Sequence, residues 1–243
     1  MIDSQTESHD SPHPLDHVIW SSLTTQHRSF AEGNELARRY QVGVAPFGAT
    51  SGTSPEYFEA LAQLLTPDEH VVLFTVDELP RLQNFEVVLS NDIDQMVGPA
   101  AGDSNPDTEI VPLGPGDLDD MMELIELTKP GPFGPRTLEL GKYLGVRVDG
   151  RLAAITGERM HLDGYTEVSA VCSHPDFRGR GFPGDLILAV SDGITKRGEL
   201  PFLHVLSENQ AAIALYRKLG FTLRRAMRFT VLRRLAPSIT TTS

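Results

Sequence analysis

Two stretches decide the fold: residues 171–184, VCSHPDFRGRGFPG, and residues 209–221, NQAAIALYRKLGF. The first begins as a β-branched strand and passes through a glycine-rich turn into a helix predicted over 182–197. Free backbone N–H groups and the positive end of a helix dipole meet at such a turn, which predicts a phosphate-binding site. In the second stretch, Asn209 and Tyr216 lie seven residues apart and therefore share one face of a predicted helix over 209–219.

The segments around these stretches alternate between strand and helix patterns. Strands are predicted at 110–112, 143–148, 152–160, 166–172, 202–206 and 229–235, and a further helix is predicted from 117 to about 128. Asp149-Gly150 is a two-residue hairpin signal. This order of elements predicts a mixed α/β fold.

The first 108 residues have a different pattern. Short helices are predicted at 15–23, 34–39 and 55–65, and strands at 71–75 and 85–89. The segment 99–108 is rich in Gly, Pro, Asn, Asp and Ser, which favours a linker. The predicted organisation is a disordered leader (1–14), a smaller α/β region of unknown role (15–98), a linker (99–108), a main domain (109–235) and a disordered tail (236–243).

The net charge of −12 is unevenly distributed, with 4 Lys/Arg against 17 Asp/Glu in residues 1–108. Such an acidic chain is a poor candidate for nucleic acid or an anionic membrane. No apolar run approaches the roughly 20 residues that span a bilayer, and the single cysteine suits a reducing compartment. We therefore expect a cytoplasmic protein, and a homodimer is left open. His9, His13 and His17 have helical metal-site spacing, but Pro12 and Pro14 prevent that helix, so no metal is expected.

Together, the runs 171–181 and 209–221 resemble the GNAT superfamily of N-acetyltransferases, whose core would cover residues 109–235. The resemblance implies the GNAT acyl-CoA N-acyltransferase fold, a mixed and mainly antiparallel sheet with flanking helices. It also implies acetyl-CoA as co-substrate and transfer of its acetyl group to a primary amine by direct attack in a ternary complex. Two alternatives remain: a catalytically weak or inactive acyl-CoA-binding regulatory module, and a dimer scaffold with no CoA site.

By the same resemblance, the backbone of Val171, Cys172 and Ser173 would face the pantetheine arm, and one N–H would polarise the thioester carbonyl. The diphosphate would be wrapped by Arg178, Gly179, Arg180, Gly181, Phe182, Pro183 and Gly184. Pro183 departs from the family pattern, which has Gly or Ala there. Proline removes one donor, which Gly184 is expected to replace.

The resemblance also implies catalytic roles. Tyr216 would protonate the leaving thiolate, and Asn209 would cap its helix and reach the pantetheine amides. Glu167 lies eleven residues before Arg178, where many members keep a carboxylate that accepts the proton of the amine, and Glu158 is the rival base.

Three further groups of residues are considered as functional candidates and are not assigned to the site. A covalent acyl-enzyme through Cys172 and His174 is disfavoured, because a buried cysteine usually only packs. His204, in an apolar strand, is predicted to be a satisfied core histidine. Arg224 and Arg225 could meet a carboxylate, although a solvated edge is favoured for them.

Overall fold

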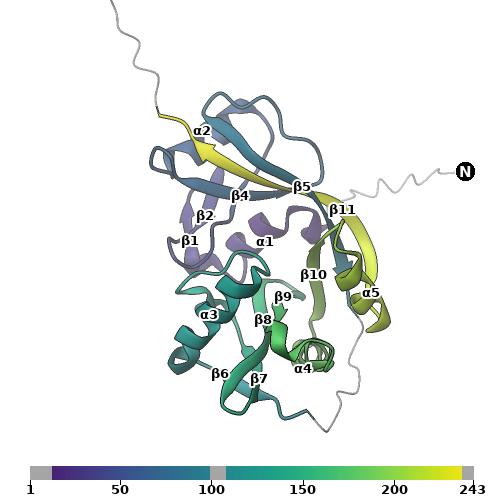
Figure 1. The fold of residues 1–243 in the computed structure, drawn as a ribbon. Helices are drawn as coiled ribbons and strands as arrows, with labels where there is room; N and C mark the ends of the chain where they lie inside the picture. Colours follow the sequence, from purple (N-terminus) through teal and green to yellow (C-terminus); the bar gives the residue numbers. More distant parts are fainter. Residues whose placement is uncertain (1–12, 99–107, 237–243) are drawn as a thin grey trace, which may run out of the picture.

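A computed structural model describes residues 13–98 and 108–236. Most of the predicted leader, linker and tail, including His9, lies outside the described residues. The main feature is an eight-stranded sheet in the order β4-β11-β5-β10-β9-β8-β7-β6 (Figure 1). Its strands are β4 (His70–Thr75), β5 (Phe85–Val97), β6 (Val111–Leu113), β7 (Tyr143–Val148), β8 (Arg151–Leu162), β9 (Tyr165–Ser173), β10 (Leu200–Leu206) and β11 (Thr222–Arg234). All neighbours are antiparallel except β9 and β10, which confirms the predicted mixed, mainly antiparallel sheet.

Helices cover both faces of this sheet. They are α1 (Val18–Thr24), α2 (Pro55–Gln63), α3 (Leu118–Thr128), α4 (Phe182–Lys196) and α5 (Gln210–Lys218). Ala154 of β8 packs with Leu186 of α4, whereas its neighbour Ile155 packs with α3. Because successive strand side chains point to opposite faces, α4 and α3 lie on opposite sides of the sheet. No helix among the described residues combines the length and the apolar character needed to cross a membrane.

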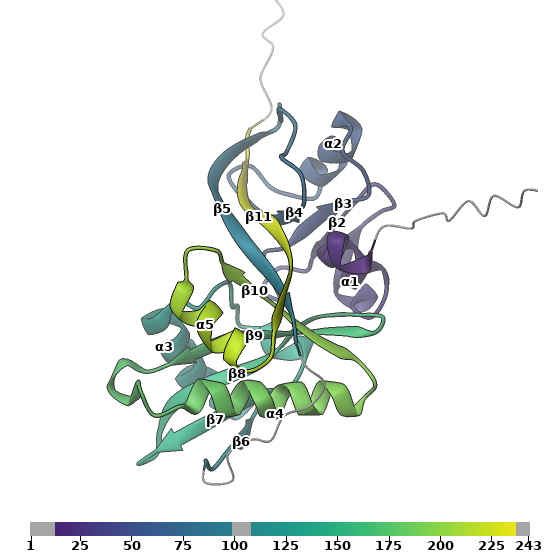
Figure 2. The same cartoon turned by 90° about the vertical axis from the view of Figure 1, so that its right-hand side faces the viewer.

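The sheet contains strands from both sides of the predicted linker. Strand β5 lies between β10 and β11, and Ile93 of β5 is opposite both Leu206 and Met227. The two sheet neighbours of β11 are β4 and β5. Figure 2 shows β5 and β11 as a long curved pair that connects the N-terminal elements with the lower half of the molecule. The N-terminal region thus contributes two strands, β4 and β5, to the central sheet.

Several local predictions are confirmed. Strand β7 has the predicted bounds, and α4 begins at the predicted Phe182. Asp149 and Gly150 both have positive φ (50° and 81°), as a two-residue I′ hairpin turn requires. The final strand is longer than predicted, because β11 extends over 13 residues.

The helix predicted at 34–39 is wrong. The Asn34 side chain accepts hydrogen bonds from the backbone N–H groups of Leu36 and Ala37, which makes a turn. The chain then enters β2 (Ala37–Tyr40), the middle strand of a small sheet with β1 (Ala31–Gly33) and β3 (Gly48–Thr50). Tertiary pairing overrides the helix propensity of these residues.

Candidate active site

The central sheet divides between β9 and β10. Their parallel pairing joins Leu200–Phe202 to Tyr165–Glu167 and ends there, although β9 continues to Ser173 and β10 to Leu206. Beyond this point β9 stays paired with β8 as far as Ser173, while β10 follows β5 as far as Leu206. Among the described residues, each strand therefore has one backbone edge without a strand partner, and the two edges diverge beyond the Glu167–Phe202 pair. The opening between these diverging edges is called the cleft below.

A bulge in β9 lies just after the division. From Ile155 to Gly157 strand β8 advances two residues, whereas β9 advances three, from Cys172 to Ser169. The bulge therefore consists of Ala170 and Val171. Ala170 has a φ of 53°, a left-handed conformation that is uncommon for a residue other than glycine. Such bulges redirect a strand and are frequent next to active sites.

The free edge of β9 carries the backbone of Val171 and Ser173. The N–H of His174 donates to the Ala153 carbonyl on β8 at 2.8 Å, and Cys172 is paired with Ile155 of the same strand. Because backbone groups alternate sides along a strand, the N–H and C=O groups of Val171 and Ser173 point to the cleft. The backbone of Cys172 points away from it.

The Cys172 side chain packs against α3 and is buried. Burial raises the pKa of this thiol to about 11. The thiolate form needed for nucleophilic attack is therefore scarce at neutral pH. His174 is engaged elsewhere, since its Nδ1 accepts the backbone N–H of Asp176. This environment agrees with the prediction that disfavours a covalent acyl-enzyme.

The glycine-rich turn provides unpartnered donors at the start of α4. Gly179 and Gly181 have φ of 79° and 83°, and Gly181 is the N-cap of the helix. Within the described residues, the backbone N–H groups of Gly179, Arg180, Gly181 and Phe182 have no hydrogen-bond acceptor. A Cβ added at Gly179 or Gly181 would meet no atom within 4 Å, so the space in front of these donors is open. This arrangement fits a diphosphate.

The structure corrects the role predicted for Gly184. Its N–H donates to the Gly181 carbonyl at 2.9 Å, so it does not replace the donor that Pro183 lacks. Charge comes from two exposed arginines. Arg180 lies over the Phe177 ring with its guanidinium carbon 5.3 Å from the ring centroid, and Arg178 forms no ion pair with any described residue.

Helix α5 lies beside the start of α4. A Cβ placed on Gly184 would be 3.8 Å from a methyl carbon of Leu215 and 4.0 Å from one of Leu219. The side chain of Asn209 caps α5 by accepting the N–H of Ala212 at 3.1 Å, as predicted. Tyr216 is buried in the cluster between α4, α5 and β10, and this burial raises its pKa to about 12. The fold therefore brings the Tyr216 helix next to the glycine-rich turn.

Glu167 lies at the closed end of the cleft and is fully buried. Its two oxygens accept from Arg159 at 2.7 and 2.8 Å, and one also accepts from His204 at 2.7 Å. Burial alone would raise the pKa of Glu167, but the ion pair with Arg159 and the His204 hydrogen bond outweigh it and lower the pKa to about 2. A general base works best with a pKa near the operating pH, so these surroundings are unfavourable for proton acceptance.

His204 belongs to a row of polar side chains across the sheet. The Gln95 carbonyl oxygen accepts from Arg224 at 2.7 Å, so its amide nitrogen donates to the Leu15 carbonyl and to His204 Nε2. His204 Nδ1 donates to Glu167 on its other side. The prediction of a satisfied core histidine is confirmed.

Arg224, Arg225 and Glu158 all belong to ion pairs. Arg224 and Arg225 both bind the carboxylate of Asp16, at 2.8 and 2.9 Å. Arg225 is exposed, as the predicted solvated edge requires, whereas Arg224 is partly buried. Glu158 pairs with Arg197 at 2.9 Å, at the C-terminal end of α4. Since α4 has 15 residues and is about 22 Å long, this carboxylate lies near the helix end opposite the glycine-rich turn.

Sequence reasoning missed Arg159, Gln95 and the bulge at Ala170. A charged residue inside the apolar run 152–160 was the available signal for Arg159, because a charge in a buried strand needs a partner. Gln95 and Ala170 gave no signal, since their roles depend on pairing between distant strands.

The chain is similar to known proteins over most of its length. The FR47-like protein family matches residues 143–230. A crystal structure from Novosphingobium aromaticivorans, assigned to the GNAT family of acetyltransferases, is 37% identical, with 93% of this chain and 100% of that one covered and a TM-score of 0.86. A GCN5-related N-acetyltransferase from Kribbella flavida has the same fold at 16% identity, with 92% and 96% covered and a TM-score of 0.61. No curated protein matches the chain.

Proposed function

Since this chain is an acyltransferase that belongs to the GNAT family, we propose that it moves an acetyl group from acetyl-CoA to a primary amine by direct attack in a ternary complex. The observation that carries this proposal is the cleft between β9 and β10, with unpartnered N–H groups at its mouth. The diphosphate would bind the N–H groups of residues 179–182. The pantetheine arm would bind the backbone of Val171 and Ser173.

The reaction would proceed in one displacement. The nitrogen of a neutral amine attacks the thioester carbonyl carbon, an N–C bond forms, and the C–S bond breaks with the electron pair leaving on sulfur. A backbone N–H of β9 at the cleft would stabilise the developing oxyanion. The Tyr216 hydroxyl, whose pKa is about 12, stays protonated at neutral pH and would donate its proton to the leaving thiolate. The attacking nitrogen loses one proton to water as the amide forms, and the phenolate takes up one proton from water, so no net proton is gained or lost in the transfer.

We assign Glu167 to positioning instead of proton acceptance. Its carboxylate holds Arg159 and His204 at the closed end of the cleft, and its low pKa leaves it unprotonated at neutral pH. The proton of the amine would be lost to water before attack. An amine with a pKa near ~10 is neutral in about one molecule in a thousand at pH 7, so the rate should rise with pH.

A catalytically inactive acyl-CoA-binding module is the alternative, favoured by the donor that is missing at Pro183 and not replaced by Gly184. The experiment that separates the two is thiol release from acetyl-CoA with a library of primary amines, in parallel with calorimetry of acetyl-CoA binding. Binding together with amine-dependent thiol release supports the enzyme. Binding without release by any amine supports the module, and absence of binding contradicts both. We propose the cytoplasm as the site of action.

A further inference from the structure

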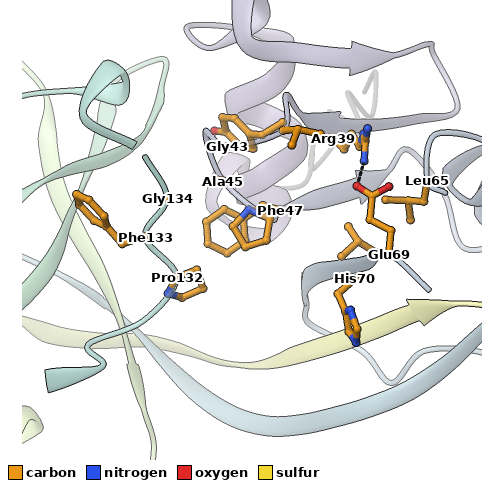
Figure 3. Close-up of a pocket in the computed structure, with 14 residues that line it drawn as sticks. Arg39, Gly43, Ala45, Phe47, Leu65, Glu69, His70, Pro132, Phe133 and Gly134 are labelled. Carbon is orange, nitrogen blue, oxygen red and sulfur yellow. Dashed lines mark hydrogen bonds and ion pairs between the residues drawn. The ribbon is translucent and has the colours of Figure 1, made fainter. Parts of the chain in front are cut away.

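A cavity lies where the N-terminal region meets the loop after α3. It has a volume of about 400 Å³, within the range of small-molecule sites. Its wall comes from three separate segments: Arg39–Phe47, Leu65–Val71 and Pro132–Gly134 (Figure 3). Apolar and aromatic side chains dominate the wall, among them Tyr40, Phe47 and Phe133.

The inner wall of this cavity contacts the closed end of the cleft. The guanidinium carbon of Arg159 lies 4.8 Å from the centroid of the Phe47 ring, and Arg159 holds Glu167. Glu167 is in turn the last residue of β9 that pairs with β10. One layer of side chains therefore separates the cavity from the point where the sheet divides.

Phe133 connects the cavity to the bulge in β9. Its ring meets Tyr143 edge-on, with centroids 5.6 Å apart. Tyr143 packs directly on Gly157, and Gly157 is opposite Ser169, the residue before the bulge residue Ala170. The cavity, Tyr143 and the bulge thus lie in sequence across β7, β8 and β9.

The hydroxyl of Tyr143 is buried and has no hydrogen-bond partner among the described residues. Buried hydroxyl groups in native proteins are nearly always paired, so an orphan of this kind points to a missing water or ligand group. Tyr143 is not one of the residues that line the cavity, but its ring contacts Phe133, which does. The unpaired hydroxyl therefore lies behind the cavity wall.

At the outer end of the cavity, the guanidinium group of Arg39 is already paired with carboxylates. Arg39 pairs with Glu69 and, at 2.9 Å, with Glu32. Two carboxylates against one guanidinium leave a net negative charge. This cluster disfavours a ligand that bears a carboxylate, because Arg39 already has two acidic partners.

From these observations we infer that the cavity binds the acceptor, and that the acceptor is a primary amine with an aromatic or branched apolar body and no carboxylate. The apolar body would fill the space between Phe47 and Phe133, with the amino group on the side of the cavity that faces the divided sheet. This inference rests on the proposed acetyl transfer. It gives the N-terminal region a role in substrate selection.

The test compares 2-phenylethylamine with phenylalanine and ethanolamine, in thiol release with acetyl-CoA and in direct calorimetry without it. The variant Ala45→Leu fills the cavity, since Ala45 lines it. Ala49→Leu is the matched control, because Ala49 is also a partly buried alanine beside the same core cluster but lines a different pocket.

The expected result is that 2-phenylethylamine is the preferred acceptor and that Ala45→Leu weakens its binding and raises its KM by roughly 10-fold or more. Ala49→Leu should leave both unchanged, and acetyl-CoA binding should be unchanged in both variants.

The inference is overturned if phenylalanine or ethanolamine is preferred, or if both leucine variants act alike. These outcomes differ from failure of the proposed function, in which acetyl-CoA itself does not bind. Calorimetry with 2-phenylethylamine alone still decides whether the cavity holds the amine in that case.

Discussion

Glu167 and Phe202 are the last residues through which β9 pairs with β10, and the Glu167 side chain at this point is completely buried against Arg159 and His204. Division of the sheet thus begins at an enclosed ion pair. A carboxylate in this place holds three strands in a fixed arrangement. Replacing Glu167 should therefore lower the stability of the protein.

Glu167→Gln should reduce the free energy of unfolding at pH 7 by about 3–5 kcal/mol, because it leaves the buried Arg159 charge without its partner. The pKa of Glu167 is about 2 in the folded state, below its value in an unfolded chain. Its stabilising contribution is therefore present above about pH 4.5 and is lost as the pH falls toward 2. Urea unfolding at pH 7, 4 and 3 should show this loss in the natural protein and a flatter dependence in the variant.

The control for this prediction is Glu86→Gln, which breaks an exposed ion pair with Arg233. Its effect should stay below about 1 kcal/mol. Equal stability of the two variants would show that the Glu167 pair does not hold the sheet.

Tyr216→Phe should lower kcat by roughly 100-fold and leave the Kd of acetyl-CoA unchanged, because only the proton donor is removed. Steady-state kinetics and calorimetry measure the two quantities. Tyr165→Phe serves as control, since its hydroxyl contacts His13 at the far end of β9. Unchanged turnover in Tyr216→Phe would remove this residue from the mechanism.

Gly181→Ala should weaken acetyl-CoA binding by roughly 10-fold or more, because the added methyl group enters the open space where the diphosphate is expected and strains a residue with positive φ. Gly164→Ala is a matched control. Gly164 has nearly the same φ, 79°, with equally open surroundings, but it lies in the turn between β8 and β9. Both variants should lose similar stability, and only the first should bind acetyl-CoA more weakly in calorimetry.

Ile93→Asp should destabilise the whole protein by about 3 kcal/mol or more, because Ile93 is buried in β5 between β10 and β11. Val88→Asp, on the same strand but half exposed, should change stability by less than about 0.5 kcal/mol. Thermal unfolding followed by circular dichroism would compare them. Two separate transitions, with only the first shifted in Ile93→Asp, would mean that the N-terminal strands do not support the rest of the sheet.

The pH dependence of kcat/KM should follow the amine. The rate should rise tenfold per pH unit up to the pKa of the acceptor, without an earlier plateau, because Glu167 has a pKa of about 2. No decline due to Tyr216 is expected below about pH 11, since its pKa is about 12. Two acceptors with different pKa values should give two different inflections. A shared inflection near neutral pH would reveal a base on the enzyme.

Much of the second half could be predicted from sequence, because its signals are local. Asn209 capping α5, Asp149-Gly150 in a hairpin and the glycine turn before α4 each depend on a few neighbouring residues. The same locality explains why the turn and Tyr216 could be assigned to one site.

The rest depends on pairing over long distances. Strand β11 contains several arginines and exposed positions, so its hydrophobic pattern is weak, and its full length follows only from β4 and β5 on either side. The charge state of Glu167 was equally hidden, because Arg159 and His204 come from two other strands. The sequence identifies Glu167 as a carboxylate but does not reveal that Arg159 lies beside it.

The place of β5 has a consequence for biosynthesis. Ser90 and Thr230 face each other across β5 and β11, 140 residues apart in the chain. Such distant closure is entropically slow, and here β11 leaves the ribosome well after β5. Until β11 is available, β4 and β5 have unpaired backbone edges, which can pair with other chains and lead to aggregation. Chaperone demand during translation should therefore fall when β11 emerges.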